Sequence, residues 1–284
     1  MPFSPSQIAA AYAQCEATAR GHYENFPVAS LLLPKDARRH VAAVYAFARQ
    51  ADDFADEPAY EGRRLERLAE WDRWIDQAAA GEASHPTFIA LSQTIAERRI
   101  PVELLHDLVR AFTQDVRVTG YATFEDLLGY CRLSANPVGR IVLNLFGHRE
   151  ERLLVQSDAI CTALQLANFW QDVAIDLGKG RCYIPREDLA RFRCSDQDLR
   201  TARVTPAFVE LMRFEIDRTR ALFGRGAGLP ARVGGRLGFE LKLVVLGGLR
   251  ILQRIEKAGY DIFRRRPSLT VPDWGRLLFK VPWL

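Results

Sequence analysis

The segment Leu164–Asp176 constrains the fold more than any other part of the chain. It contains no proline or glycine and is mostly apolar, yet polar residues recur in it at Gln165, Asn168, Asp172 and Asp176. Spacings of three and four residues place these side chains in one stripe on an α-helix. The apolar remainder predicts a helix buried nearly all round, where a carboxylate pair is costly unless a cation or donor compensates it. Oxygen ligands alone favour a hard cation such as Mg²⁺ over a soft metal.

A second segment, Ala42–Glu57, has the same character. Its helical stripe comprises Tyr45, Arg49, Asp52 and Asp56, with Asp53 and Glu57 beside it and small or apolar residues elsewhere. One such acidic pair indicates no more than a solvated helix face. Two pairs on apolar helices, far apart in the chain, are a stronger signal. If the two helices face each other, their carboxylates line one cavity and hold Mg²⁺ ions and, through them, a diphosphate.

Composition sets broad limits on the kind of protein. The 284 residues are 48% hydrophobic, enough for one large globular domain or two small ones. A net charge of +4 gives no reason to expect a nucleic-acid partner. The five cysteines are scattered without C-x-x-C spacing, and the five histidines form no close cluster, which predicts cytosolic thiols and packed or surface histidines. Neither a signal peptide nor an apolar run of ~18 residues is present, so a soluble or peripheral protein is expected.

The periodicity predicts helices and no strands. We expect helices at Ala9–Arg20, Ala37–Glu57 with Asp36 as its N-cap, Arg63–Ala80, Pro86–Arg98, Pro101–Val116, Phe124–Leu133, Glu150–Leu177, Pro206–Arg225 and Arg236–Ala258. Neither a G-x-G-x-x-G motif nor a P-loop is found. The sequence therefore predicts one all-α domain of roughly ten to thirteen helices around a central cavity.

Four irregular segments have two interpretations each. Ser134–Gly139 interrupts a long helix, either as a simple kink or as a widened spot for a bulky apolar ligand. Lys179–Pro185 either caps a helix or forms a lid whose basic residues reach phosphate. The basic turn Arg264–Pro267 is expected to be solvated rather than functional. The tail Asp273–Leu284 packs on the domain or lies in a membrane interface, with packing slightly favoured.

These motifs, in this order, resemble the squalene and phytoene synthase family. Tyr45–Asp56 is similar to the first aspartate motif of that family, and Gln165–Asp176 is similar to the second. Tyr130–Gly139 and Gly180–Pro185 match two further segments. The resemblance covers nearly the whole chain and implies a single domain over residues 1–284 with the all-α isoprenoid-synthase fold.

The resemblance also implies roles for individual residues. The ligands of roughly two or three Mg²⁺ ions would be Asp52, Asp56, Asn168, Asp172 and Asp176. Catalytic groups, including those that position water, would be Tyr45, Arg49, Tyr130 and Gln165. Substrate would be bound by Phe26, Arg49, Asp53, Phe169, Lys179, Arg181 and Tyr183. Each aromatic residue in these sets is also compatible with plain core packing.

Two departures from the family pattern point to one branch. His22–Ser30 stands where many members carry Ser-x-Ser-Phe, and Gln171 stands where many carry arginine. With Asn168–Asp172, these features resemble the bacterial hydroxysqualene synthases. That branch implies conversion of presqualene diphosphate to hydroxysqualene, with Mg²⁺, with water as the nucleophile and without NADPH, in squalene and hopanoid biosynthesis.

Two alternatives remain open at this point. The chain could be a head-to-head synthase that condenses two prenyl diphosphates to presqualene diphosphate, squalene, dehydrosqualene or phytoene. It could also be a non-catalytic assembly factor with the same fold, although such a factor would be expected to lose the acids. A cytoplasmic location is expected. A peripheral contact of the tail with the inner membrane face, and contacts with other enzymes of the pathway, are left open.

Overall fold

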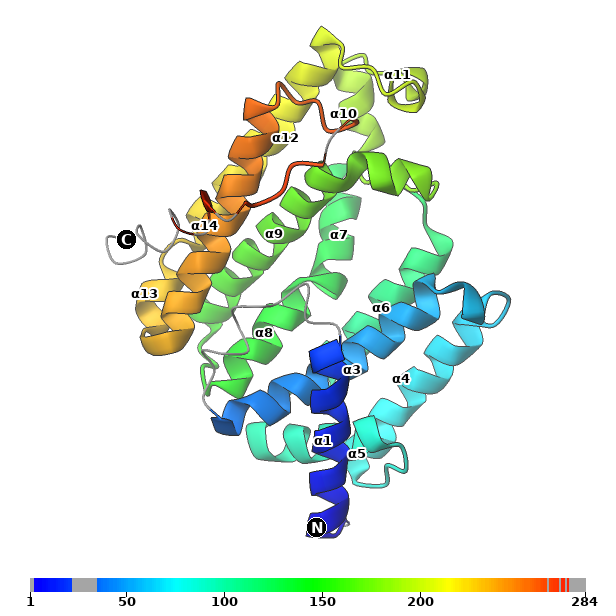
Figure 1. Ribbon diagram of the computed structural model, residues 1–284, viewed down its shortest axis with the longest axis vertical. Helices are drawn as coiled ribbons and strands as arrows, with labels where there is room; N and C mark the ends of the chain where they lie inside the picture. The colour runs from blue at the N-terminus through cyan, green and yellow to red at the C-terminus, as the bar shows by residue number, and fades with distance from the viewer. Residues whose placement is uncertain (1–2, 22–34, 265, 271, 274, 276–284) are drawn as a thin grey trace. The chain divides into compact units, whose positions relative to one another are not determined.

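The computed structural model describes residues 3–21, 35–264, 266–270, 272–273 and 275 (Figure 1). These residues form thirteen α-helices and one 3₁₀-helix. Within the same ranges there is no β-strand, and the only extended pairing is an isolated bridge between Gly120 and Cys182. The prediction of an all-α chain is confirmed. No helix in the described part of the chain is long and apolar enough to span a bilayer.

The chain forms two compact units, each built from two chain segments. The first unit comprises Met1–Arg117 and Pro137–Leu154, and the second comprises Val118–Asn136 and Val155–Leu284. Each unit is described by itself below. The single domain expected from the sequence stays a prediction.

The first unit is built around the helix that carries the first acidic segment. Its elements are α1 (Pro5–Gly21), α3 (Lys35–Asp56), the 3₁₀-helix η1 (Pro58–Tyr60), α4 (Arg64–Ala80), α5 (Pro86–Arg98), α6 (Glu103–Arg117) and most of α8 (Asn136–Leu145). Helix α3 contacts α1, α4, α5 and α6. Its buried Phe47 packs on Trp71 and Phe88, with ring centroids 6.1 and 5.8 Å away. The apolar face of α3 is thereby fixed, and its acidic face is left partly accessible.

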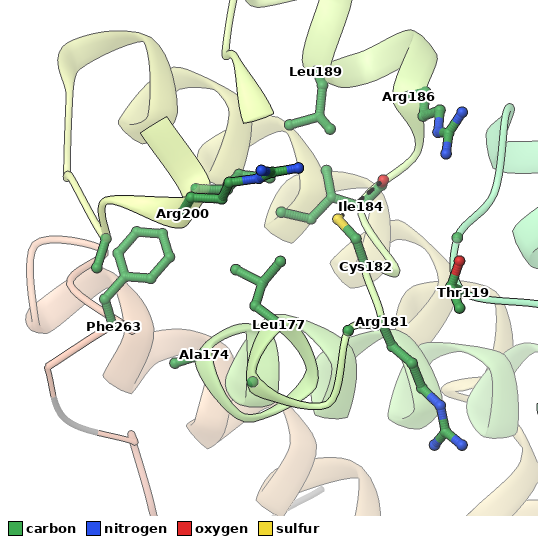
Figure 2. A pocket seen from close by; sticks show the side chains of 15 residues that line it. Thr119, Ala174, Leu177, Arg181, Cys182, Ile184, Arg186, Leu189, Arg200 and Phe263 are labelled. Carbon is green, nitrogen blue, oxygen red and sulfur yellow. Dashed lines mark hydrogen bonds between the residues drawn. The ribbon is translucent and has the colours of Figure 1, made fainter. Parts of the chain in front are cut away.

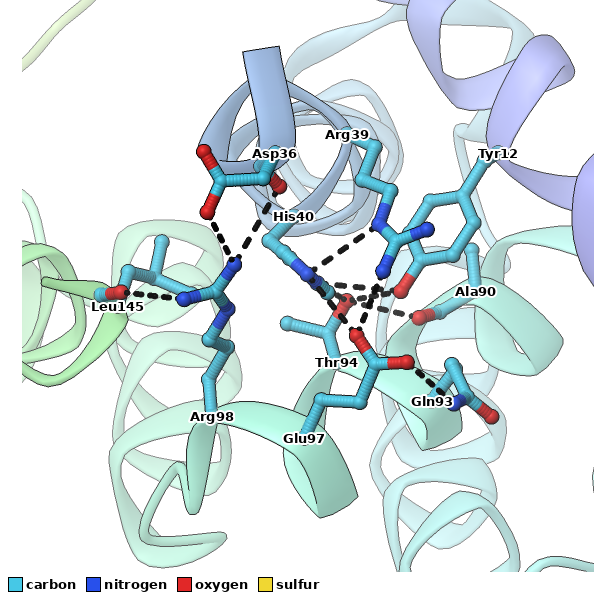
Figure 3. A network of polar contacts seen from close by, with 10 residues as sticks. All are labelled: Tyr12, Asp36, Arg39, His40, Ala90, Gln93, Thr94, Glu97, Arg98 and Leu145. Atoms are coloured by element: carbon cyan, nitrogen blue, oxygen red, sulfur yellow. Dashed lines mark hydrogen bonds and ion pairs between the residues drawn. The ribbon is translucent and has the colours of Figure 1, made fainter. Parts of the chain in front are cut away.

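A buried polar network joins α1, α3 and α5 in this unit (Figure 3). The Nδ1 atom of His40 lies 3.1 Å from the Tyr12 hydroxyl and 3.0 Å from the Thr94 hydroxyl. Its Nε2 atom lies 3.2 Å from a carboxylate oxygen of Glu97. Burial lowers the pKa of His40 to about 4, so the ring is neutral near pH 7. His40 is fully buried, which agrees with the prediction of packed or surface histidines.

The second unit contains the long helix with the second acidic segment. Its elements are α7 (Phe124–Ser134), α9 (Glu151–Gly178), α10 (Arg186–Arg191), α11 (Asp196–Arg200), α12 (Pro206–Gly226), α13 (Leu229–Val233) and α14 (Gly235–Lys257). The buried Trp170 of α9 donates its indole N–H to the Thr219 hydroxyl of α12 at 2.9 Å. The sequence did not predict α10, α11 or α13, because five or six residues are too few to show a helical period.

Two sequence expectations about these helices have different outcomes. The predicted interruption is confirmed, because α7 ends at Ser134 and α8 begins at Asn136. Asn136 is anchored by the Thr162 hydroxyl, which donates to its side-chain oxygen at 2.9 Å. The prediction that Leu164–Asp176 is buried nearly all round is wrong, because Ile175 is 47% exposed and Asn168 is also exposed. Part of this helix lies at the surface of its unit.

Close backbone packing in the second unit requires glycine at position 238. A Cβ atom on Gly238 would lie 2.3 Å from the carbonyl oxygen of Pro230. We expect Gly238→Ala to lower the free energy of unfolding by about 1–3 kcal/mol, because the backbone must move apart. The matched control is Gly224→Ala, where the space around the Cβ is empty. Equal urea midpoints for the two variants would contradict this expectation.

Candidate active site

The acidic face of α3 carries one arginine among three carboxylates. Arg49 lies 3.3 Å from an Asp52 oxygen and 2.6 Å from an Asp53 oxygen. The Asp52 side chain is 44% exposed, whereas that of Asp53 is 24% exposed. Asp56, one turn further along, is partly buried. Carboxylate oxygens of three residues are thus grouped on this face of α3, and such oxygens are the ligands that Mg²⁺ prefers.

Tyr45 precedes Arg49 by one turn on α3 and is also partly buried. Burial raises the pKa of the Tyr45 hydroxyl, which keeps it protonated and able to donate a hydrogen bond. Helix α3 is fixed against α4 next to these residues, because the Trp71 indole N–H donates to the carbonyl of Phe47 at 3.2 Å. The structure therefore places the predicted residues of the first motif on one partly accessible side of α3.

The acidic stripe of α9, comprising Gln165, Asn168, Asp172 and Asp176, has graded exposure. Asn168 is exposed, and the other three residues are partly buried. The neighbouring Leu166, Ala167, Phe169, Trp170 and Val173 are buried, so they fix the helix. The predicted separation of a polar stripe from an apolar remainder is thus present on this part of α9.

Asp172 has a partner that the sequence did not indicate. Arg266 places Nε 2.5 Å from one Asp172 oxygen and Nη2 3.0 Å from the other. The adjacent Gln171 is buried and donates its amide N–H to the carbonyl of Pro267 at 2.5 Å. Arg266 is 48% exposed, in agreement with the predicted solvated turn, but its ion pair with Asp172 was not predicted. No local pattern could have revealed it, because Arg266 lies 94 residues from Asp172.

Four rings form an aromatic cluster in the second unit: Tyr121, Tyr130, Phe169 and Tyr183. Phe169 and Tyr183 stack in parallel with ring centroids 3.8 Å apart. Tyr130 lies 6.1 Å from both of these rings, and Tyr121 lies 5.7 Å from Tyr130. Three of the four residues were predicted individually. Tyr121 was missed, because it belongs to none of the sequence motifs.

The segment after α9 is held by its backbone. Gly180 adopts a positive φ of 75°, and the Arg181 N–H donates to the carbonyl of Asp176 at 2.8 Å. The Cys182 N–H donates to the carbonyl of Thr119 at 2.7 Å. This geometry caps the helix and presents Tyr183 to the aromatic cluster. Lys179 is exposed and Arg181 is partly buried, and their predicted contact with phosphate stays a prediction.

The predicted metal ligands belong to different units. Asp52 and Asp56 are in the first unit, and Asn168, Asp172 and Asp176 are in the second. Among the described residues, no three His, Cys, Asp or Glu side chains gather closely enough to hold a metal by themselves. The oxygen donors on each helix nevertheless fit the ligand chemistry of Mg²⁺. The magnesium assignment therefore stays a prediction.

Three other sequence predictions fall wholly or partly outside the described residues. Phe26 and the rest of His22–Ser30 lie outside them, as does most of the tail Asp273–Leu284. Asp273 itself is described and is buried, with an ion pair to Arg250 at 2.7 Å and another to Arg254. The start of the tail is thus anchored to α14, in agreement with packing at this one point.

Comparison with known proteins places these motifs in a family. The family model described as squalene/phytoene synthase matches residues 19–273, which include both acidic segments and the aromatic cluster. The chain belongs to the squalene/phytoene synthase family. As a member of this family, it is an enzyme of the prenyltransferase type with the corresponding all-α fold.

Individual relatives carry different names. A hydroxysqualene synthase of Zymomonas mobilis is 37% identical over an aligned length of 241, and the alignment covers 79% of this chain and 76% of that protein. A 15-cis-phytoene synthase of Synechococcus elongatus is 29% identical over 297 residues, covering 98% and 94%. The crystal structure of squalene synthase HpnC from Alicyclobacillus acidocaldarius has 43% identity and a TM-score of 0.87, covering 90% of this chain and 97% of that one.

Proposed function

We propose that the protein converts presqualene diphosphate to hydroxysqualene in squalene and hopanoid biosynthesis, with Mg²⁺ and without NADPH. The observation that carries the chemistry is the arrangement on α9, where Phe169 of the aromatic cluster follows Asn168 of the acidic stripe directly. Asn168, which would bind the diphosphate through Mg²⁺, and Phe169, which would favour a cation, are thus neighbours on one helix. The choice of branch is supported by the 37% identity to a hydroxysqualene synthase.

The acidic residues would bind the departing diphosphate through metal. Asp52 and Asp56 of α3, and Asn168, Asp172 and Asp176 of α9, would supply the oxygen ligands. Bound Mg²⁺ would stabilise the negative charge that develops on the leaving group. Arg49, Lys179 and Arg181 would bind the diphosphate directly, and Asp53 would orient Arg49 through its ion pair at 2.6 Å.

The aromatic cluster would favour the positive charge that is left on the carbon skeleton. The face of an aromatic ring attracts a cation by about 0.5–2 kcal/mol. Tyr130 is only 5% exposed and Phe169 only 4%, so bulk water has little access to them. One water molecule must still add to the cation, and the hydroxyl groups of Tyr45 and Tyr130 and the amide of Gln165 are the candidates that would hold it.

Product analysis tests this proposal. The protein would be incubated with presqualene diphosphate and Mg²⁺ in H₂¹⁸O without NADPH, and the lipid products analysed by mass spectrometry. The expected product is hydroxysqualene with one ¹⁸O atom. Squalene, dehydrosqualene or no product would overturn the assignment.

A condensing synthase is the second candidate, favoured by the 15-cis-phytoene synthase relative that aligns with 98% of the chain. Farnesyl diphosphate or geranylgeranyl diphosphate, each supplied alone with Mg²⁺, distinguishes the two reactions. Efficient formation of presqualene diphosphate or phytoene would establish the condensing activity. Lack of turnover with every substrate would favour the alternative of a non-catalytic assembly factor.

The ion pair of Arg266 with Asp172 gives a prediction about metal affinity. Arg266 competes with a cation for the Asp172 carboxylate, so Arg266→Gln is expected to tighten apparent Mg²⁺ binding by up to about fivefold. Mg²⁺ titrations monitored by thermal unfolding measure the change. The control is Arg264→Gln, because Arg264 is 85% exposed and pairs with Asp261 instead. An unchanged Mg²⁺ midpoint in Arg266→Gln would contradict a metal role for Asp172.

A further inference from the structure

A cavity of about 560 Å³ lies in the second unit beside the C-terminal end of α9 (Figure 2). Its walls are largely apolar and include Leu177, Ile184, Leu189, Leu199 and Phe263. Its size falls within the range of about 300–1,000 Å³ that small-molecule sites usually have. None of the residues assigned to the diphosphate site lines it except Arg181.

The polar groups around this cavity carry positive charge. Arg181, Arg186 and Arg200 line it, and no acidic residue does. Figure 2 shows the Arg200 side chain reaching over Leu177 toward Ile184, whereas the guanidinium of Arg181 points away. Arg200 has no ion pair with any residue that the structure describes. A guanidinium that has no ion pair within the described part of the chain, above apolar side chains, favours a ligand with an anionic group and a hydrocarbon part.

The end of α9 could oppose an anion, because a helix C-terminus carries partial negative charge. Its last carbonyl groups are, however, already occupied. The Arg181 N–H donates to the carbonyl of Asp176, and the Gly180 N–H donates to that of Leu177 at 3.0 Å. These hydrogen bonds reduce the partial negative charge at the C-terminus of α9. Arg200 belongs to a different helix, α11, and reaches the cavity from there.

The cavity is distinct from the acidic stripe and the aromatic cluster. Ala174 lines it, and at 3.6 residues per turn Ala174 projects about 200° round α9 from Asp172. In the segment after α9, alternate residues likewise face the cavity and the aromatic cluster. Cys182 and Ile184 line the cavity, whereas Tyr183 between them stacks on Phe169.

We propose that this cavity is a second binding site, for an amphiphile with one hydrocarbon chain and a phosphate or carboxylate head. The chain lies against Leu177, Ile184 and Leu189, and the head binds Arg200. Such a molecule is either a free metabolite or a lipid from a bilayer, and the head-group chemistry is the same in both cases. The site is independent of the proposed reaction, since Leu177, Ile184, Leu189 and Arg200 are assigned no part in that reaction.

Cys182 provides a local readout that does not depend on activity. Its thiol lines the cavity and is partly exposed, while Cys161 is partly exposed without lining it. Dodecyl phosphate is expected to slow alkylation of Cys182 by N-ethylmaleimide, and to leave the rate at Cys161 unchanged. Peptide mass spectrometry gives both rates from one sample. Dodecanol, which has the chain without the charge, is expected to protect Cys182 at least about tenfold less well.

Charge reversal tests the assigned head-group contact. Arg200→Glu is expected to raise the calorimetric dissociation constant for dodecyl phosphate at least about tenfold, whereas Arg203→Glu changes it by less than about twofold. Arg203 is a nearby exposed arginine that does not line the cavity. Similar affinities in both variants, or equal protection by dodecanol, would overturn the proposal.

A vesicle experiment separates the two sources of the ligand. Vesicles of phosphatidylcholine with phosphatidylglycerol are compared with free dodecyl phosphate in the Cys182 assay. Protection by dodecyl phosphate alone assigns the site to a free metabolite, and protection by vesicles, lost in Arg200→Glu, assigns it to a bilayer lipid. Absence of protection by both would overturn the site.

Discussion

Asp172→Asn is expected to lower the rate of diphosphate release from presqualene diphosphate by about a hundredfold or more. Asparagine keeps the size of the side chain and removes its charge, so the proposed metal site would lose one negatively charged ligand. Asp52→Asn on α3 is expected to act in the same direction, because both acidic segments would bind the same diphosphate. Single-turnover measurements of diphosphate release in saturating Mg²⁺ report the effect directly.

The control for this loss of activity lies on the same helix. Asp158 of α9 is partly buried and lies on the same face of the helix, but fourteen residues before Asp172 and so about 20 Å from it along the axis; Asp158→Asn is therefore expected to retain most of the activity. Thermal unfolding of each variant separates lost catalysis from lost folding, since Asp172 also pairs with Arg266. Near-normal release of diphosphate by both Asp52→Asn and Asp172→Asn would end the assignment of these residues as metal ligands.

The two acidic helices could be predicted because their signal is local. A period of three and four residues over Leu164–Asp176 fixes both the helix and the face on which Asp172 and Asp176 lie. The boundaries agree closely, since the expected Glu150–Leu177 is α9, Glu151–Gly178. Tyr130, Phe169 and Tyr183 could likewise be named from their motifs. Their mutual contacts could not, because rings far apart in the chain meet only through folding.

The partners of the acidic stripe could not be predicted for the same physical reason. Gln171 differs from the family pattern, and from the sequence this substitution indicates only the loss of an arginine. In the structure, Gln171 holds the carbonyl of Pro267, and the preceding Arg266 places its guanidinium on Asp172. A positive charge is thus present beside the second motif, supplied by another part of the chain. Pairings of this kind have no period, so sequence patterns do not reveal them.

A buried ionic cluster in the second unit, also without a sequence signal, gives the largest expected effect on stability. Arg218 of α12 lies 2.5 Å from a Glu215 oxygen and 2.8 Å from an Asp188 oxygen, and its guanidinium lies 3.5 Å from the Phe124 ring centroid. Arg218→Met is expected to cost about 3–5 kcal/mol, because it leaves the buried carboxylate of Asp188 without its counter-charge. Urea unfolding at pH 7 measures this loss. The control is Arg220→Met, whose pair with Glu256 is about one-third exposed and is expected to contribute about 1 kcal/mol or less.

Protonation of Glu215 makes the free energy of unfolding depend on pH, which gives a second test of this ionic cluster. Burial raises the pKa of Glu215 from its ordinary value of 4.5 to about 8, so the folded state binds this proton more tightly than the unfolded state does. The contribution of Glu215 to stability is therefore fully present below pH 4.5 and is lost as the pH rises toward 8. Glu215→Gln is expected to flatten this decline and, combined with Arg218→Met, to recover part of the lost stability. A double variant no more stable than Arg218→Met, with an unchanged slope against pH, would show that the loss comes from packing on Phe124 rather than from uncompensated charge.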